Sequence, residues 1–181
     1  MKLFAGIDLG GTKIYCIIID EKGNILGKDK QKTKSDEGFD SVIARIHSCY
    51  LAAIADAGKK ETDIQTVGMA VPGAFNVDKG LLINAPNLRW KNIELSKIIS
   101  SKLSKPVFID NDANMGIYGE YSFGKCGKTK DIYGLFIGTG IGGGYIVNGD
   151  IVRGHNFTAG EIGHAIVKVG GPLCNCGKRA R

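Results

Sequence analysis

No apolar run in the 181-residue sequence approaches about 20 residues, the length that a helix needs to cross a bilayer. The amino terminus also lacks the basic segment and the following apolar segment of a secretory signal. The five cysteines are an odd number, and Cys16, Cys49 and Cys126 are isolated, so no disulfide framework is indicated. We therefore expect a cytoplasmic protein that does not bind membranes.

The basic residues lack the aromatic neighbours that are typical of a nucleic-acid interface. The net charge is +6, but the densest basic stretch, residues 28–34, alternates lysine with other residues and contains no aromatic side chain. Such alternation is typical of a solvent-facing strand with its lysines on one face. We expect no nucleic-acid partner, and a phosphate-bearing ligand explains part of the positive charge more simply.

Apolar, β-branched segments at residues 3–7 and 14–19, with a third strand at 25–34, predict an antiparallel meander. Apolar positions at helical spacing predict a helix from residue 39 to 57, with Asp36 as its N-cap and Gly58 just beyond its end. Residues 64–71 form a continuous apolar run, typical of a strand buried on both faces. The remaining expected elements are helices at 93–103 and 111–121, strands at 106–109 and 132–137, and a hairpin of 144–147 with 151–152.

The pattern of strand, glycine turn and strand restarts after Lys128, as though it copied the opening of the chain. Strands followed by alternating helices and strands predict an α/β protein of two similar lobes. We expect the first lobe to span residues 1–126 and the second to begin at residue 127.

Glycine is abundant, with 27 residues, and the first cluster lies between two predicted strands, in the run Asp8-Leu-Gly-Gly-Thr-Lys13. Gly10 and Gly11 can adopt positive φ and leave room for backbone N–H groups and the Thr12 hydroxyl to face phosphate oxygens. Lys13 adds positive charge, and Asp8 can hold a hydrated Mg²⁺. The spacing is not that of a P-loop. On this motif alone, an ordinary hairpin turn is an equal alternative.

A second glycine cluster, Gly138-Thr-Gly-Ile-Gly-Gly-Gly144, also lies between two predicted strands. Two glycine turns that each carry a threonine and each open one lobe can hold a polyphosphate from both sides. The pair therefore favours phosphate binding through Gly138, Thr139 and Gly140, although a flexible hairpin is the alternative for this loop alone.

Three further groups of polar residues are candidates for chemistry. Asp112 lies where a strand passes into a helix, and its carboxylate can accept the proton of an attacking hydroxyl, although a plain helix N-cap is the more common use. Glu161 and His164 can bind the hydroxyls of a polyol or lie on a surface turn. Cys174 and Cys176, with His164, supply three of the four ligands of a structural zinc site, and two reduced thiols are an even alternative.

Taken in order, these motifs resemble those of the repressor, open-reading-frame and kinase (ROK) family of sugar kinases, in particular its bacterial glucokinases. The resemblance extends from Phe4 to Arg179. It rests on four motifs in the same order and spacing, 8–13, 111–114, 138–144 and 160–164, and on the shorter segments 71–73 and 85–88.

The resemblance implies an actin-like ATPase (ribonuclease H-like) fold, with ATP and a hexose in the cleft between the lobes. It implies that Asp112 takes the proton of the sugar 6-hydroxyl, and that Mg²⁺ and ATP are required. It also implies the other site residues: Gly73, Asn111, Glu161 and His164 for the sugar; Asp8, Gly10, Gly11, Thr12, Lys13, Gly138, Thr139 and Gly140 for the ATP phosphates and metal; and His164, Cys174 and Cys176 for Zn²⁺.

The sequence departs from the family pattern at its carboxy-terminal residues. Arg181 stands where the family has its last zinc cysteine, and a guanidinium cannot ligate zinc. We expect an incomplete second lobe and an inactive fragment, with exposed apolar surface that favours a homodimer or a larger homo-oligomer. The alternatives are a non-catalytic sugar sensor and a transcriptional regulator of the same family. The regulator is disfavoured because residues 1–7 leave no room for a helix-turn-helix.

Overall fold

The computed structural model describes residues 2–126, 129–138, 140–174, 177 and 179. The chain divides into two compact units, Met1–Asp112 and Ala113–Arg181, and each is described by itself. The expected boundary, after Cys126, lies about one helix further along the chain than the observed one. The helix in question, α3 (Asp112–Phe123), packs on the strands that follow it, so most of its residues belong to the second unit. That the two units are functional lobes stays a prediction.

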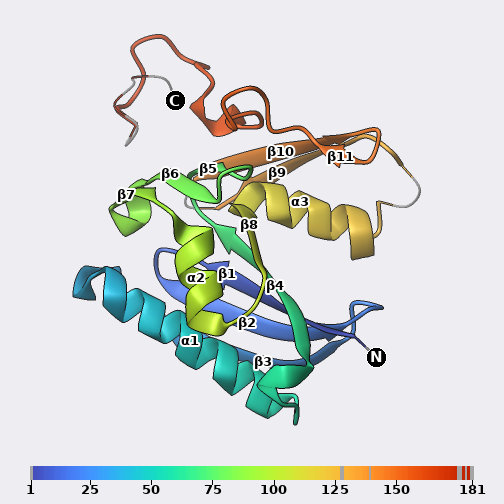
Figure 1. The fold of residues 1–181 in the computed structure, drawn as a ribbon. Coiled ribbons are helices and arrows are strands. Elements are labelled where there is room, and N and C mark those ends of the chain that lie inside the picture. The colour runs from blue at the N-terminus through green and yellow to red at the C-terminus, as the bar shows by residue number, and fades with distance from the viewer. Residues whose placement is uncertain (1, 127–128, 139, 175–176, 178, 180–181) are drawn as a thin grey trace. The chain divides into compact units, whose positions relative to one another are not determined.

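The first unit is built on a five-stranded sheet with the order β3-β2-β1-β4-β8. The first three strands pair antiparallel, which confirms the expected meander, whereas β1, β4 and β8 run parallel to one another. Figure 1 labels these elements. The strand bounds are β1 Leu3–Leu9, β2 Lys13–Asp20, β3 Ile25–Lys32, β4 Ile64–Val71 and β8 Val107–Asn111.

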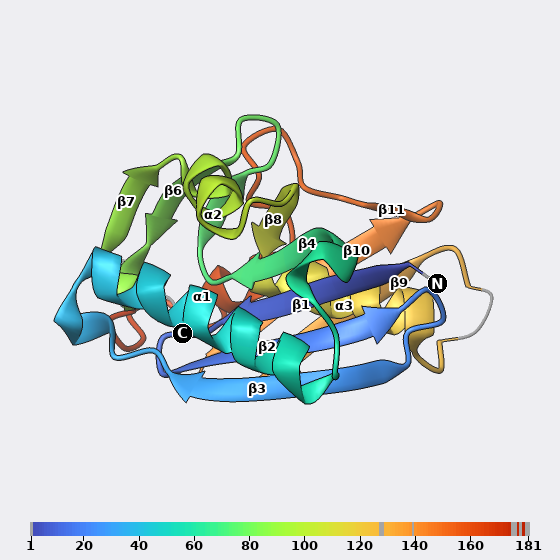
Figure 2. The same ribbon diagram turned by 60° about the horizontal axis from the view of Figure 1, so that its bottom comes forward.

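The core of the first unit lies between this sheet and α1 (Phe39–Asp56), which runs along β2 and β3 in Figure 2. Successive residues of β1 alternate between buried and more accessible positions, as the pleat of a half-buried sheet requires. The same alternation holds for β4, so the expectation that this strand is buried on both faces was wrong. Of the two α-helices described in this unit, α1 packs on β1, β2 and β3, and α2 (Leu95–Leu103) packs on β8.

A second small sheet, β5-β6-β7, was not predicted. Its strands are Ala74–Asn76, Leu81–Ala85 and Trp90–Ile93, and α2 (Leu95–Leu103) follows directly. Residues 90–93 form a strand by pairing with β6, and Trp90 packs its ring edge-on against Phe39, with the ring centroids 4.8 Å apart. The expected helix therefore begins later than residue 93.

Of the two capping residues predicted for α1, only the one at its carboxyl end is confirmed. Gly58 has φ +63° and lies just beyond the last helical turn, as expected. At the other end, Gly38 is the N-cap residue and not Asp36, because Ser35–Glu37 forms a separate 3₁₀ turn. Asp36, three residues before the first residue of the helix, is thus part of a preceding turn.

The second unit contains α3 and a three-stranded antiparallel sheet of β9 (Ile132–Ile137), β10 (Ile141–Val147) and β11 (Asp150–Ile151). The helix packs closely on the sheet: a Cβ on Gly134 would lie 2.9 Å from Ile117, and one on Gly144 would lie 3.2 Å from Asn114. Because β10 begins at Ile141, the glycine loop is shorter than the sequence suggested. Within the described residues, no helix has the length and apolarity needed to span a membrane.

The close approach of β3 to α1 predicts a large effect of one added methyl group. A Cβ on Gly27 would lie 2.5 Å from the carbonyl oxygen of Ala53 and would also collide with the backbone of Ala57, so Gly27→Ala should destabilise the fold by about 2–3 kcal/mol. Gly119→Ala, on α3, is the matched control. Its Cβ would meet no described atom within 4 Å, so its stability should be unchanged or higher by about 0.5–1 kcal/mol. Urea unfolding of the two variants measures the contrast, and equal effects would refute the close packing.

Candidate functional site

The candidate site of the first unit lies where three parallel strands end. The register places Asp8 of β1 beside Ala70 of β4, and Ala70 beside Asp110 of β8. The carboxyl ends of β1, β4 and β8 therefore meet at one edge of the sheet. Open α/β sheets bind their ligands outside this edge, because the loops that follow the strands diverge there. Four predicted groups are brought to it: Asp8, the Gly10–Lys13 turn, Gly73 and Asn111 with Asp112.

The turn between β1 and β2 is closed by a hydrogen bond from the Gly10 N–H to the Lys13 carbonyl oxygen, 2.8 Å long. Neither Gly10 nor Gly11 has the positive φ that we expected of them. Space is limited at Gly10, where a Cβ would lie 3.1 Å from the Lys13 carbonyl oxygen, whereas a Cβ at Gly11 would make an ordinary contact, 3.4 Å from the Asn87 Cβ. The turn presents exposed Thr12 and Lys13 side chains.

Asp8 and Asp112 form a pair of like charges within this site. Asp8 is exposed, and the neighbouring protein atoms desolvate its carboxyl group only in part. That desolvation, followed by the negative charge of Asp112, raises the pKa of Asp8 above its ordinary value of 3.8. A divalent cation beside Asp8 would relieve both effects, so the pair is electrostatically suited to Mg²⁺.

Gly73 and Asn111, two of the predicted sugar-binding residues, contact each other directly. The Asn111 side-chain amide donates a hydrogen bond to the Gly73 carbonyl oxygen at 3.0 Å. Gly73 has φ +108°, and a Cβ there would collide with the Asn84 carbonyl oxygen and lie 2.9 Å from the Ala85 Cα. Only glycine fits this turn, and the contact fixes the orientation of the Asn111 amide.

Two residues of this edge were missed as site residues. Asp110 is buried, and its carboxylate accepts a 2.7 Å hydrogen bond from the Asn111 backbone N–H. Asn87 packs against Gly11. The signal for Asp110 was an acidic residue in an otherwise apolar strand, and for Asn87 it was the Ala85-Pro-Asn-Leu88 segment, which had been noted without a role.

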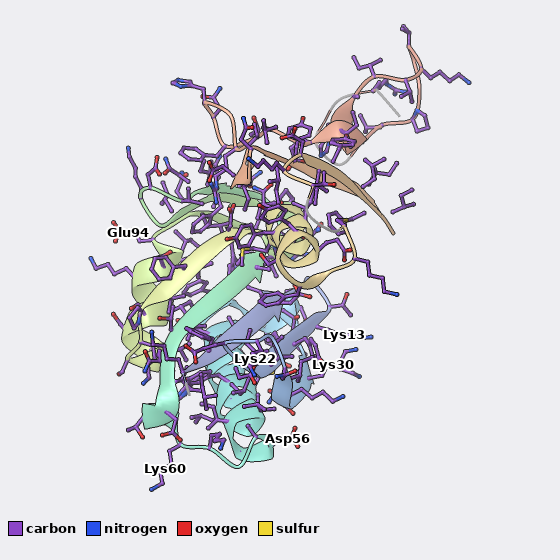
Figure 3. All side chains as sticks on the ribbon, turned by 90° about the vertical axis from the view of Figure 1, so that its right-hand side faces the viewer. Lys13, Lys22, Lys30, Asp56, Lys60 and Glu94 are labelled. Atoms are coloured by element: carbon purple, nitrogen blue, oxygen red, sulfur yellow. The ribbon has the colours of Figure 1, made fainter. Side chains whose placement is uncertain are left out.

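A row of lysines extends from the Gly10–Lys13 turn along β3. Lys13 pairs in register with Lys32, and Lys30 pairs with Tyr15 on the neighbouring strand. Lys28, Lys30 and Lys32 are exposed on one face of β3, which confirms the expected alternation. Figure 3 shows the labelled Lys13 and Lys30 on this side of the sheet. A shallow hollow there has both signs of charge in its lining, with Asp8 among the lysines.

In the second unit, the Gly138–Gly140 turn joins β9 to β10, and the Gly138 N–H donates to the Gly140 carbonyl oxygen at 2.9 Å. Neither glycine adopts a positive φ. Thr139, the hydroxyl-bearing residue of this predicted phosphate loop, lies outside the described residues. Phosphate binding by this turn stays a prediction.

His164 lies between Glu161 and Cys174. Its Nε2 is 3.6 Å from a Glu161 carboxylate oxygen, and its Nδ1 is 3.7 Å from the Cys174 Sγ. Two atoms bound tetrahedrally to one zinc, with bonds of about 2.0–2.3 Å, are separated by roughly 3.6 Å. The Nδ1–Sγ pair therefore fits two positions of a zinc site and leaves Nε2 directed at Glu161.

The described residues do not complete that zinc site. They include no group of three histidine, cysteine or acidic side chains suited to one metal ion. Cys176, the third ligand that the sequence predicted, lies outside the described part of the chain. Zinc therefore enters no step derived below.

The strand order of the first sheet and the antiparallel sheet of the second unit define a mixed α/β protein of the actin-like ATPase fold. In the first unit, the Gly10–Lys13 turn follows β1 at the sheet edge that carries Asp8 and Asp112. The chain belongs to the ROK family, which it matches over residues 4–180. It is similar to the glucokinase of Thermotoga maritima, with 35% identity over 96% of this chain and 54% of that protein. It is also similar to the xylose repressor of Caldicellulosiruptor bescii, with 33% identity over 95% and 43%.

Solved structures of the family agree with this fold. A ROK family glucokinase from Streptomyces griseus, in complex with glucose and AMPPNP, matches with a TM-score of 0.88 and 32% identity over 98% of this chain and 55% of that one. The ROK hexokinase of Thermus thermophilus matches with a TM-score of 0.82 and 30% identity over 98% and 58%. The chain spans about half the length of these relatives.

The raised pKa of Asp8 predicts that function and stability oppose each other at this residue. A carboxyl whose pKa is higher in the folded state favours folding when protonated, and this stabilisation is lost as the pH rises through the raised pKa. Asp8→Asn should therefore increase stability at pH 7, and its advantage should shrink as the pH falls toward 3.8. Urea unfolding at pH 7, 5 and 4 measures the effect. An advantage that does not change with pH would show that Asp8 is not desolvated.

Proposed function

We propose that this chain carries the sugar- and phosphate-binding part of an ATP-dependent hexose kinase that phosphorylates a glucose-like sugar at its 6-hydroxyl. The observation that carries the proposal is the meeting of the Gly10–Lys13 turn, Asp8, Gly73, Asn111 and Asp112 at one sheet edge. The similarity to glucokinases, one of them crystallised with glucose and an ATP analogue, supports it.

In this proposal Asp112 is the general base. The carboxylate accepts the proton of the sugar hydroxyl as the oxygen attacks the terminal phosphoryl group, and the charge that develops on the phosphate requires positive partners. The Lys13 side chain and the N–H groups of Gly11 and Lys13 supply them, since the Gly10 N–H already donates to the Lys13 carbonyl oxygen. Mg²⁺, when bound, would be held by Asp8 and would neutralise phosphate charge. The geometry supports these roles because Asp8 and Asp112 interact electrostatically at the same edge.

We further propose that Gly73 and Asn111 contact sugar hydroxyls, since their mutual hydrogen bond fixes the Asn111 amide. In the second unit, Glu161 and His164 are the candidates for sugar hydroxyls, and Gly138, Thr139 and Gly140 are the candidates for phosphate. A carboxylate next to an imidazole suits a polyol, because the two groups offer an acceptor and a second, tautomer-dependent hydrogen-bonding group.

The base role of Asp112 predicts a selective loss of turnover. In a protein completed to the length of its relatives, Asp112→Asn should lower kcat for glucose by about 10²–10⁴-fold, because the amide keeps the shape but cannot accept the proton. Glucose affinity should stay within about threefold. Coupled ADP-release kinetics and calorimetry with glucose measure the two quantities. A loss of kcat smaller than about tenfold would exclude Asp112 as the base.

A sugar-binding regulator is the second candidate, because the xylose repressor of Caldicellulosiruptor bescii is about as similar to this chain as the glucokinases are. A sensor needs the sugar-binding residues but not the base. The same assay separates the two functions: a sensor binds sugar, including xylose, without sugar-dependent ADP release, and Asp112→Asn leaves its behaviour unchanged.

We also propose zinc binding by His164, Cys174 and Cys176, which would orient the imidazole toward the sugar. Cobalt(II) reports on such a site, because thiolate ligands give it a charge-transfer absorption. The chain should develop this absorption on titration with cobalt, and Cys174→Ser should weaken it strongly. Cys126→Ser, at an exposed cysteine in a different segment, is the matched control and should have no effect. Equal spectra for both variants would rule out the site.

A further inference from the structure

Thr33 is a polar residue that is completely buried, with 0% of its surface exposed, directly after β3. Its position means that it cannot touch a ligand. Both of its hydrogen-bond donors nevertheless end on the Gly10–Lys13 turn. The Thr33 hydroxyl donates to the Gly10 carbonyl oxygen at 2.6 Å, and the Thr33 N–H donates to the Thr12 carbonyl oxygen at 2.9 Å.

Together with the bond within the turn, these two bonds account for three of its four carbonyl groups. Gly10 and Thr12 direct their oxygens to Thr33, and Lys13 directs its oxygen to the Gly10 N–H. In a planar trans peptide the carbonyl and the following N–H point in opposite directions, and the described part of the chain has no cis peptide. Holding the Gly10 and Thr12 oxygens therefore turns the N–H groups of Gly11 and Lys13 away from Thr33.

This orientation matters for an anion. A phosphate oxygen is attracted by backbone N–H groups and repelled by carbonyl oxygens, so a phosphate-binding turn must keep its oxygens on the opposite side. Glycines at 10 and 11 lower the cost of the alternative, in which a peptide unit rotates and presents an oxygen. A turn with two adjacent glycines needs an external constraint, and the fold supplies one in Thr33.

Thr33 is itself anchored on its other side. Arg45, on α1, lies 3.5 Å from the Thr33 carbonyl oxygen, donates a 2.8 Å hydrogen bond to Ser41 Oγ and forms an ion pair with Glu37. The Thr33 backbone is thus held by α1 through its carbonyl oxygen, while its hydroxyl and N–H hold the turn on the other side.

We propose that Thr33 is a positioning residue for phosphate binding, which acts by holding the Gly10 and Thr12 carbonyls back so that the Gly11 and Lys13 N–H groups face the phosphates. This inference rests on the proposed function and assigns a role to a residue outside the ligand-contacting set. Thr33→Val removes the hydroxyl at nearly constant shape, and Thr33→Ser retains it.

The first measurement needs no ligand. Amide hydrogen exchange, followed by NMR on the 181-residue chain, should accelerate at Gly10 by about tenfold or more in Thr33→Val, because the turn bond from Gly10 to Lys13 opens more often. Thr33→Ser should exchange at close to the original rate, and amides in the middle of α1 should be unchanged in both variants. Unchanged exchange at Gly10 in Thr33→Val would overturn the proposal.

The second measurement uses tripolyphosphate with Mg²⁺ as the probe, followed by calorimetry. Thr33→Val should bind it about tenfold more weakly than the unaltered chain, Thr33→Ser within about threefold, and glucose affinity should be the same in all three. Equal losses in both variants, in step with their thermal stability, would reduce Thr33 to a structural residue and refute the role. If the unaltered chain binds no tripolyphosphate, the proposed function fails at this turn, while the exchange experiment still decides whether Thr33 orients it.

Discussion

The parallel pairing of β1, β4 and β8 is the constraint on which the rest of the first unit depends. Parallel strands bring their carboxyl ends to one edge, and in this chain each of the three strands ends in groups that can bind or react. The residues involved are far apart in the sequence. Asp8 and Asp112 interact electrostatically although about a hundred positions separate them, because the register sets Asp8 beside Ala70 and Ala70 beside Asp110. A one-residue slip would turn each of these side chains to the other face.

The same edge brings together carboxylates whose surroundings are electrostatically unfavourable. Desolvation and a neighbouring carboxylate raise the pKa of Asp8, and the carboxylate of Asp110, which accepts a hydrogen bond from the Asn111 N–H, is buried. Such groups are retained in a fold when a cation or a polar substrate makes use of them. Hydrogen bonds fix the backbone around this edge. The Asn111 amide donates to the Gly73 carbonyl oxygen, and the Thr33 hydroxyl donates to the Gly10 carbonyl oxygen of the Gly10–Lys13 turn.

Much of this arrangement follows from local sequence patterns. The meander and the strands at 64–71 and 132–137 were predicted from short apolar segments, and the helix that precedes Gly58 was predicted from apolar positions at helical spacing. The small β5-β6-β7 sheet was missed, since its strands are short and depend on tertiary contacts such as that of Trp90 with Phe39. The motifs include Gly73, Asn111 and Asp8, which the strand register brings to one edge. They do not include Thr33 or Asp110, whose hydrogen bonds no spacing rule reveals.

Glycines that look alike in the sequence have different structural roles in this fold. Gly73 is required both for its positive φ and for the backbone that approaches it, whereas Gly10 and Gly11 have ordinary φ, and only Gly10 lies in a tight space. Sequence presents all three as the same residue in a turn. A turn whose glycines are not held by their own conformational preference must be held from outside, and the core of the first unit, whose buried apolar residues all lie between Leu3 and Ile109, provides a rigid support for doing so. The Gly10–Lys13 turn is thus fixed by Thr33, which lies between β3 and α1. This support comes from the first unit alone and needs no ligand.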